Sequence, residues 1–408
     1  MFGCRSIIGP SGGVFSLFVA QVPLRAIGVS CIVGFMTAEV IRISGRQGDL
    51  DRIKRAAELV EAGGLVAFPT ETVYGLACRV ERTSLARLDR VKGRDAGKHY
   101  TLHIGQMDEY RKYVPKIGIQ AEKLIREAWP GPLTLVFELG PAEMEVQKQR
   151  LDGETVRTLY KDNSIGIRCP DQPVASLLLR LVDHPVVAPS ANHGGQPPAT
   201  NADQVLSQLG DEVDMILDGG PCKHKKSSTV AFVGKHEVRL LREGVYSQQE
   251  LQKMSEVTFL FVCTGNTCRS PMAEGLFRKY LAEKIGCSVD ELEGRGYKVL
   301  SAGTMDMPGA PASAEAINAC AAKGVDIASH ASRSLTRSLV DTSDFIFGMT
   351  RSHCEQVVFL SAEAERKCSL LARDGEVPDP IGQPQTRFDG CANLIEAAVK
   401  TRVSELVL

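Results

Sequence analysis

The feature that most constrains this chain is a polar loop between an apolar strand and an amphipathic helix. The loop is the octet Cys263-Thr264-Gly265-Asn266-Thr267-Cys268-Arg269-Ser270, and Pro271 follows it. Residues 257–262 ahead of it have the pattern of a buried strand, and residues 272–285 behind it that of a helix with one apolar face. Ser270 suits the helix N-cap and Pro271 the first helical position. The pattern predicts an α/β unit whose loop N–H groups converge on an anion at a helix N-terminus.

The residue types of the octet suit phosphoryl chemistry. A phosphoryl group requires N–H donors and a planar bidentate cation, which Arg269 supplies. The nucleophile is expected to be the Cys263 thiolate, which a helix N-terminus and a guanidinium both favour, and the Ser270 hydroxyl is placed to hold it. A cysteine and an arginine at this spacing alone would fit an inert buried cysteine equally well. The complete octet with Pro271 disfavours that reading.

The octet resembles the low-molecular-weight protein tyrosine phosphatase family, over about residues 256–408. Supporting segments are 301–303, 329–333 and 377–380. In that family an Asp-Pro carboxylic acid protonates the leaving group, and Asp379 matches it, although an aspartate before proline is by itself typical of a turn. The resemblance implies that the same carboxylate then activates water and that no metal or other cofactor is needed. It makes Cys263, Arg269 and Asp379 catalytic, and the phosphate loop consists of Thr264, Gly265, Asn266, Thr267, Cys268 and Ser270.

The expected substrate is phosphoarginine rather than phosphotyrosine. Thr267 stands where tyrosine-specific members usually carry a bulky aliphatic residue, and threonine there is similar to the protein-arginine phosphatases of the family. Ile381 and Gly382 follow Asp379-Pro380 where tyrosine-specific members usually place aromatic residues. An arsenate reductase, a third relative, would need two further redox cysteines. Met349 occupies that neighbourhood with only Cys354 nearby, so the relay is expected to be incomplete.

Composition bounds the remaining possibilities. A length of 408 residues predicts two or three domains, and a net charge of −1 gives no bulk electrostatic reason for nucleic acid or membrane binding. The 12 cysteines are irregularly spaced with no C-x2-C pair, which disfavours zinc, and a catalytic thiol favours a reducing, cytoplasmic compartment. Cys268 is positioned to form a protective disulfide with Cys263 under oxidation.

Residues 1–35 are apolar, Gly-rich and interrupted by prolines. We expect no stable fold there, with Met36 as the start.

Residues 37–247 are expected to form a separate mixed α/β domain. A helix is predicted over 51–62 and a short strand over 65–68. Polar motifs follow at the ends of the predicted elements, and no Walker loop or G-x-G-x-x-G fingerprint is present. Single basic residues here would be ordinary surface charges, but together they are able to neutralise phosphates. The motifs lie at 69–76, 92–94, 98, 103, 129–134, 164–168, 189–192, 227–230 and 241–244.

Together these motifs resemble the YrdC-type threonylcarbamoyl-adenylate synthases, with Lys-x-Arg and Ser-x-Asn as the characteristic signature. That family condenses L-threonine, bicarbonate and ATP into threonylcarbamoyl-AMP and pyrophosphate, for modification of ANN-decoding tRNAs by other proteins. The resemblance implies Mg²⁺ on the ATP phosphates, and positioning with charge neutralisation as the source of catalysis. It assigns threonine binding to Thr72, His103, Arg168 and Ser228. It assigns ATP binding to Lys92, Arg94, Lys98, Ser164, Ser190, Asn192 and Arg242.

Three positions depart from the family pattern. Asp95 and His99 stand where prolines are usual, and Lys225 stands where a glycine is usual. Asp95 brings a negative charge to the expected triphosphate site. The basic run 223–226 is suited to phosphate or tRNA, or to simple solvation.

The sequence thus predicts a YrdC-like mixed α/β domain over 37–247, then a short polar junction, then a Rossmann-like parallel-sheet phosphatase over 256–408. Expected partners are L-threonine, bicarbonate, ATP, tRNA or a tRNA-modifying complex, and phosphorylated proteins, with no membrane. An alternative keeps the phosphatase and treats the first domain as a nucleotide- or RNA-binding module without synthase activity.

Overall fold

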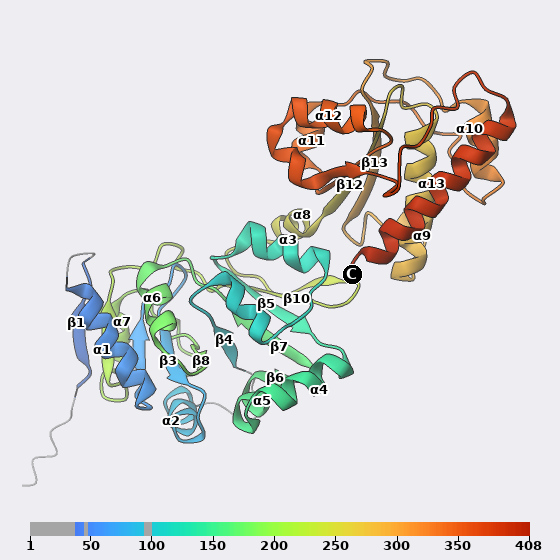
Figure 1. The fold of residues 1–408 in the computed structure, drawn as a ribbon. Helices are drawn as coiled ribbons and strands as arrows, with labels where there is room; N and C mark the ends of the chain where they lie inside the picture. Colours follow the sequence, from blue (N-terminus) through green and yellow to red (C-terminus); the bar gives the residue numbers. More distant parts are fainter. Residues whose placement is uncertain (1–36, 45–47, 94–99) are drawn as a thin grey trace, which may run out of the picture. The chain divides into compact units, whose positions relative to one another are not determined.

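The computed structural model describes residues 37–44, 48–93 and 100–408. Helices and strands are interspersed along the whole described chain, so the fold is mixed α/β, as the sequence predicts (Figure 1). In the described residues, no helix combines the length and the apolar character needed to span a bilayer.

The N-terminal part is built on a sheet that mixes parallel and antiparallel pairs. In the described residues its strand order is β1-β9-β2-β3-β8-β4-β7-β5-β10-β11, and β6 pairs with β7. The strands are β1 Glu39–Arg42, β2 Val66–Phe68, β3 Gly75–Arg79, β4 Thr101–His103, β5 Leu133–Glu138, β6 Tyr160–Lys161, β7 Ser164–Arg168, β8 Val186–Val187, β9 Met215–Asp218, β10 Thr229–Val233 and β11 Val238–Arg242. The helices are α1 Asp49–Glu61, α2 Arg82–Lys92, η1 Met107–Lys112, α3 Ile119–Ala128, α4 Pro141–Arg150, α5 Gly153–Leu159, α6 Pro173–Leu181 and α7 Ala202–Leu209.

The core of this part contains an aromatic cluster. Trp129, the only tryptophan of the chain, packs edge-on against Tyr110 and Phe137 at ring-centroid distances of 6.4 and 6.2 Å. Its indole N–H donates to the Leu133 carbonyl at 2.7 Å, so the one polar atom of the ring is satisfied inside the core.

The C-terminal part has a parallel sheet in the order β13-β12-β14-β15. A capped helix, α8 Gln248–Ser255, leads into it directly. The strands are β12 Val257–Cys263, β13 Tyr297–Gly303, β14 Phe345–Gly348 and β15 Cys368–Leu370. The helices are α9 Arg269–Ile285, η2 Val289–Glu291, α10 Ala314–Ala321, α11 Arg337–Thr342, α12 Arg351–Leu360, η3 Ala362–Lys367 and α13 Gln385–Glu405.

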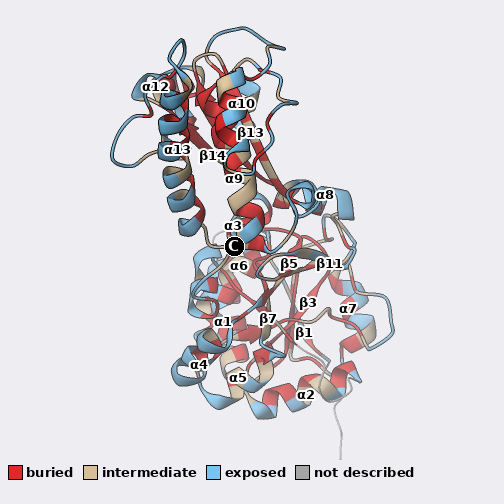
Figure 2. Ribbon diagram, turned by 90° about the vertical axis from the view of Figure 1, so that its right-hand side faces the viewer, coloured by how far each residue is buried: buried red, intermediate tan, exposed pale blue. Residues whose placement is uncertain are grey.

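Two apolar layers enclose this parallel sheet. Phe259 and Phe261 face α9, α10 and α13, while Leu260 and Val262 face α11 and α12. Figure 1 shows α9 and α13 together on one side of β12 and β13, and Figure 2 shows the strands buried beneath exposed helix faces. The run 257–262 is apolar at every position except Thr258 because both faces of the strand are covered. The predicted fold class is confirmed for both parts.

The predicted start of α9 is wrong by two residues. Cys268 is the N-cap and the helix begins at Arg269, whereas the sequence pattern places the cap at Ser270. The Ser270 hydroxyl is engaged inside the loop, with the Cys263 sulfur and the Asn266 amide, so it does not cap the helix.

Candidate active sites

The octet forms a loop at the carboxyl end of β12, with Cys263 as the last residue of the strand. The Cys263 sulfur lies 3.0 Å from the Ser270 hydroxyl and accepts the Asn266 backbone N–H at 3.2 Å. A hydroxyl and an N–H directed at sulfur are the partners that a thiolate requires. The structure therefore brings Cys263 and Ser270 together, at the N-terminus of a helix of 17 residues.

Asn266 holds the loop in shape. Its φ of 53° lies in the left-handed region, which asparagine tolerates better than most residues. Its buried amide donates to the hydroxyls of Ser270 and Ser301, at 2.8 Å each, and accepts the Arg333 N–H at 2.8 Å. Its carbonyl contacts the His330 ring nitrogen at 2.7 Å. The segments quoted at 301–303 and 329–333 thus serve as supports of the loop.

Arg269 lies under the loop and is 4 % exposed. Its guanidinium donates to the Val377 carbonyl at 3.2 Å, to the Thr264 hydroxyl at 3.3 Å and to the Asp379 carboxylate. Its Nε is buried and has no hydrogen-bond partner in the part of the chain that the structure describes. A buried, charged N–H in a loop of this kind is suited to an anionic ligand.

His353 supports the same arginine and was not identified from the sequence. Its Nδ1 accepts the Thr350 N–H at 3.1 Å, so the Nε2 proton is left for the Thr264 hydroxyl, 3.0 Å away. Burial and the neighbouring Arg269 charge lower the pKa of His353 to about 4. The imidazole is therefore neutral at physiological pH and fixes Thr264 without adding charge.

The residues at the mouth of this site are more exposed. The Asp379 side chain is 40 % exposed, and its second oxygen accepts the Ile381 N–H at 3.2 Å. Ile381 is 64 % exposed. Thr267 is half-buried, with its hydroxyl 3.6 Å from the Cys268 sulfur.

Segments distant in sequence fasten the loop from outside. The Met305 N–H donates to the Thr264 carbonyl at 2.9 Å, and the Ser313 N–H donates to the Thr267 carbonyl at the same distance. Gly303 N–H donates to the Arg333 carbonyl at 2.9 Å. The loop is therefore bonded on its outer side by the chain that follows β13.

In the N-terminal part, one row across the sheet brings three polar side chains together. Arg168 ends β7 and is paired in register with His103 of β4 on one side and Thr134 of β5 on the other. The guanidinium donates to Glu71 at 2.8 Å and to the Thr72 hydroxyl at 2.6 Å, and the Glu71 side chain is 4 % exposed. The Arg168 Nε is buried without a hydrogen-bond partner among the described residues. The predicted residues Thr72, His103 and Arg168 thus lie together.

His103 beside Arg168 is neutral. Its Nδ1 lies 3.1 Å from the Thr101 carbonyl. Burial, and then the Arg168 charge, lower the pKa of His103 to about 3. Its Nε2 is accordingly an acceptor, since the single proton of the neutral ring is on Nδ1.

Ser228 joins the same row through Thr134, whose hydroxyl lies 3.0 Å from the Ser228 hydroxyl. Arg242 donates to the Ser228 carbonyl at 2.8 Å and to the Ser228 hydroxyl at 3.2 Å. The pKa of Arg242 is lowered, mainly by burial and to a smaller extent by the Arg168 charge. Arg242, predicted among the ATP residues, therefore lies with the predicted threonine residues. Glu71 and Thr134 were missed as site residues although both fall inside quoted motifs.

Three predicted ATP residues form a second group. The buried Lys92 ammonium donates to the Ser190 carbonyl at 2.6 Å and to the Asn192 side-chain oxygen at 3.2 Å. Ser190 bridges Gly75, three residues after Thr72, so the two groups are joined by the turn at 70–75. The Lys-x-Arg and Ser-x-Asn motifs are thus in contact through Lys92.

Other predicted residues lie elsewhere. Ser164 begins β7, at the opposite end from Arg168, and its hydroxyl donates to the Lys161 carbonyl at 2.9 Å. Four residues of strand correspond to about 13 Å, so Ser164 is not next to the Arg168 group. Arg94, Lys98, Asp95 and His99 lie outside the described residues.

Lys225 has the conformation that explains the usual glycine. Its φ is 51°, in the left-handed region, three residues before Ser228. A side chain other than Gly, Asn or Asp costs energy there because Cβ crowds the carbonyl. The basic run around it is mostly exposed, and Lys226 approaches Glu243 at 3.7 Å.

Two family models match this chain, one in each part. The Sua5/YciO/YrdC family model, described as telomere recombination, matches residues 58–244. The model of low molecular weight phosphotyrosine protein phosphatases matches residues 258–407.

Individual relatives and solved structures are similar to this chain as well. A threonylcarbamoyl-AMP synthase of Pyrococcus abyssi is 29% identical over 275 residues, 62% of this chain and 78% of that protein. A putative threonylcarbamoyl-AMP synthase of Mycobacterium tuberculosis is 34% identical over 203 residues, 50% of this chain and 88% of that protein. Among solved structures, a low molecular weight protein tyrosine phosphatase from T. tengcongensis is 31% identical, covers 37% of this chain and 100% of its own, and has a TM-score of 0.33.

Proposed function

The chain belongs to the threonylcarbamoyl-AMP synthase family through residues 58–244 and to the low molecular weight phosphatases through residues 258–407, and we propose that both sites are active in one bifunctional enzyme. The first site would condense L-threonine, bicarbonate and ATP into threonylcarbamoyl-AMP and pyrophosphate. The second would hydrolyse phosphorylated protein side chains through a cysteine thiolate, with phosphoarginine preferred.

The observation that carries the synthase proposal is the buried Arg168 with its partners. A guanidinium with an uncommitted Nε is suited to pair with the carboxylate of an amino acid. The Thr72 and Ser228 hydroxyls and the neutral His103 ring surround it, and all three are able to accept or donate hydrogen bonds to a hydroxyl and an amine. These partners supply the features needed to orient threonine rather than an apolar amino acid.

Catalysis in this site would depend on position and charge. A carbamate formed on the threonine amine must reach the α-phosphorus, and the Lys92, Ser190 and Asn192 group, joined to the threonine group through Gly75, would support ATP. Mg²⁺ would accompany the triphosphate and neutralise its charge. Arg94 and Lys98 are proposed as further phosphate partners on the basis of the family resemblance. Ser164 is a weaker candidate because of its place on β7.

The synthase is tested by pyrophosphate release from ATP in the full-length protein. We expect release that needs both threonine and bicarbonate and that falls at least about a hundredfold in Arg168→Ala. Arg157→Ala, an exposed arginine paired only with a surface glutamate in the described residues, is the matched control. Binding of ATP without threonine-dependent turnover would instead identify a nucleotide-binding module.

The phosphatase mechanism follows from three side chains. The Cys263 sulfur attacks phosphorus while Arg269 and the loop N–H groups bind the equatorial oxygens. Asp379, at the mouth and hydrogen-bonded to Arg269, would donate its proton to the leaving atom and afterwards take one from the attacking water. Ser270 stabilises the cysteine as it leaves the phosphocysteine.

Thr267 and Ile381 carry the proposal of phosphoarginine specificity. A half-buried hydroxyl inside the loop suits a guanidinium leaving group, and Ile381, being aliphatic, offers no aromatic face on which a tyrosine ring would stack. The test is kcat/KM on phosphoarginine against phosphotyrosine peptides, for wild type and Thr267→Ile. We expect the phosphoarginine preference to collapse in the variant. A wild-type preference for phosphotyrosine would refute the proposal for Thr267.

The biological setting is proposed on the same grounds. Threonylcarbamoyl-AMP is an activated intermediate, so a tRNA-modifying complex is the expected consumer. The ten cysteines of the described residues are free, which supports a reducing, cytoplasmic compartment.

A further inference from the structure

Two cysteines outside the phosphate loop lie near neighbouring strands on one side of the parallel sheet. Cys368 begins β15 and is paired in register with Ile346 of β14. Gly348 is two residues further along β14, so a side chain at this position would point to the same face as Ile346. The Cys354 sulfur, from the first turn of α12, lies 2.6 Å from where a Cβ on Gly348 would stand. The glycine therefore makes room for this thiol beside β15.

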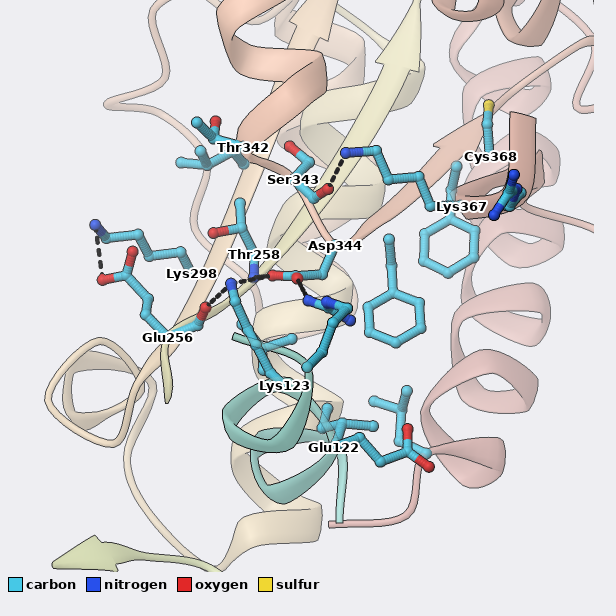
Figure 3. A pocket seen from close by; sticks show the side chains of 18 of the residues that line it. Glu122, Lys123, Glu256, Thr258, Lys298, Thr342, Ser343, Asp344, Lys367 and Cys368 are labelled. Atoms are coloured by element: carbon cyan, nitrogen blue, oxygen red, sulfur yellow. Dashed lines mark hydrogen bonds and ion pairs between the residues drawn. The ribbon is translucent and has the colours of Figure 1, made fainter. Parts of the chain in front are cut away.

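The two thiols influence each other's ionisation: the Cys368 side chain lowers the pKa of the Cys354 thiol, and the Cys354 side chain raises the pKa of Cys368. Both residues are partly buried, and Cys368 is one of the residues that line the pocket drawn in Figure 3. An acidified, accessible thiol with a second thiol in contact is the arrangement that oxidants convert to a disulfide.

The pair is separate from the nucleophile. Cys263 packs in the apolar layer with Phe259 and Phe261, whereas Ile346 and Cys368 belong to the layer on the other face of the sheet. The catalytic thiol is therefore not the partner for which Cys354 is placed. A connection to the phosphatase site exists nevertheless, because His353, adjacent to Cys354, bonds the Thr264 hydroxyl.

We propose that Cys354 and Cys368 form a reversible disulfide when the protein meets a hydroperoxide. The Cys354 thiolate attacks the peroxide, forming a sulfenic acid and releasing hydroxide. The Cys368 sulfur then displaces hydroxide from the sulfenic acid and closes the S–S bond. With hydrogen peroxide, two thiols lose two electrons and two protons, and the peroxide becomes two molecules of water. A small-molecule dithiol reverses the reaction by exchange.

The experiment uses the full-length protein in which Cys263 and Cys268 are replaced by serine, so that the phosphate loop cannot form a disulfide. The protein is treated with hydrogen peroxide near neutral pH, free thiols are alkylated, and peptides are analysed by mass spectrometry. We expect a linked peptide containing Cys354 and Cys368, lighter by two hydrogen atoms and lost after dithiothreitol. Its formation should be at least about tenfold faster than oxidation of Cys287, a half-exposed cysteine whose pKa is raised by burial.

Two variants make the test decisive. In Cys368→Ser the Cys354 sulfenic acid has no partner, so a dimedone adduct should accumulate there. In Cys354→Ser, Cys368 should remain alkylatable at the peroxide concentration that links the pair. The proposal is overturned if both thiols stay alkylatable in the parent protein while Cys287 reacts, or if Cys354 proceeds to sulfinic acid without a link to Cys368.

Discussion

The two sites of this chain each contain a buried arginine held by a carboxylate, but the two carboxylates differ in exposure. In the synthase part, Glu71 is 4 % exposed and also accepts the Asp171 N–H. In the phosphatase part, Asp379 is 40 % exposed and lies on a loop between β15 and α13. Both arginines keep a buried Nε without a hydrogen-bond partner among the described residues.

The difference separates two uses of the same ion pair. A carboxylate locked in the interior fixes its arginine in one position and keeps the site neutral until an anion arrives. A carboxylate at the surface is able to exchange the arginine for a substrate atom and for water, as proton transfer requires. We therefore propose that Glu71 positions Arg168 and that Asp379 transfers the proton.

The largest expected effect is that of Asp379→Asn. Loss of a general acid lowers kcat by about 10²–10⁴-fold, while the phosphate loop is retained and KM changes little. Steady-state kinetics on a phosphopeptide with a poor leaving group measure it. Asp374→Asn, an exposed carboxylate a few residues earlier, should leave kcat unchanged. A small effect of Asp379→Asn would assign the acid to another residue.

Glu71→Gln should destabilise the N-terminal part by about 3 kcal/mol, because it leaves the buried Arg168 charge without its counter-ion. Trp129 lies in the core of this part and is the only tryptophan, so its fluorescence during urea unfolding reports this part selectively. The control is Glu81→Gln, which removes a partly exposed pair with Arg79 and should change the stability much less. Equal effects of the two changes would contradict the positioning role of Glu71.

Asn266→Gly should lower phosphatase kcat/KM by about tenfold or more, since three hydrogen-bond partners of the amide lose it. The backbone itself would not be strained, because glycine adopts a φ of 53° readily. The control is Asn393→Ala, which changes an exposed asparagine on α13. Asn318→Gly would not serve, because a glycine inside α10 would itself weaken the helix. Unchanged activity in Asn266→Gly would show that backbone shape alone suffices.

The stability of the N-terminal part should fall as the pH falls from about 6.5 towards 3. In that window the unfolded chain binds a proton at His103 and the folded chain does not, since burial lowers the pKa of His103 from 6.5 to about 3. Lowering the pH from 6.5 by one unit should reduce the free energy of unfolding by about 1 kcal/mol. His103→Gln should flatten this slope in Trp129-monitored unfolding, and an unaltered slope would mean that other groups cause it.

The smallest effect is expected at Lys225. Lys225→Gly should stabilise the N-terminal part by about 0.5–1 kcal/mol, because the left-handed φ of 51° costs more for lysine than the added chain freedom costs for glycine. Lys223→Gly, which removes a neighbouring exposed charge where φ is not positive, should be neutral or destabilising. A stabilisation by both changes would point to charge repulsion instead of backbone strain.

The phosphatase site was the more predictable of the two from sequence. Its nucleophile, arginine and loop are contiguous, and the strand and helix that position them flank the same octet. The His353 contact was not predictable, since it depends on where α12 packs. The Cys354–Cys368 pair was missed because only their register and the glycine at 348 bring together thiols that are 14 positions apart.

To predict which residues lie together in the synthase site, the order of the strands in the sheet is needed, and the sequence does not reveal it. His103, Arg168 and Thr134 adjoin because β4, β7 and β5 are neighbours in the sheet. Ser164, a predicted ATP residue, lies at the other end of β7 from Arg168, and the motif in the sequence does not show how far its two ends lie from the other motifs. The fold class followed from periodicity, while Glu71 emerged only from its contact with Arg168.

The hydrogen bonds that tie the chain after β13 to the phosphate loop restrict how this protein is able to diverge. Met305 and Ser313 are bonded to the loop, and Arg333 contacts it again. Surface connections usually tolerate insertions and deletions. Here a change in length between 305 and 313 would displace a bond to Thr264 or to Thr267. We therefore expect related phosphatases to vary this segment in residue type, and to accept new length mainly beyond those anchors.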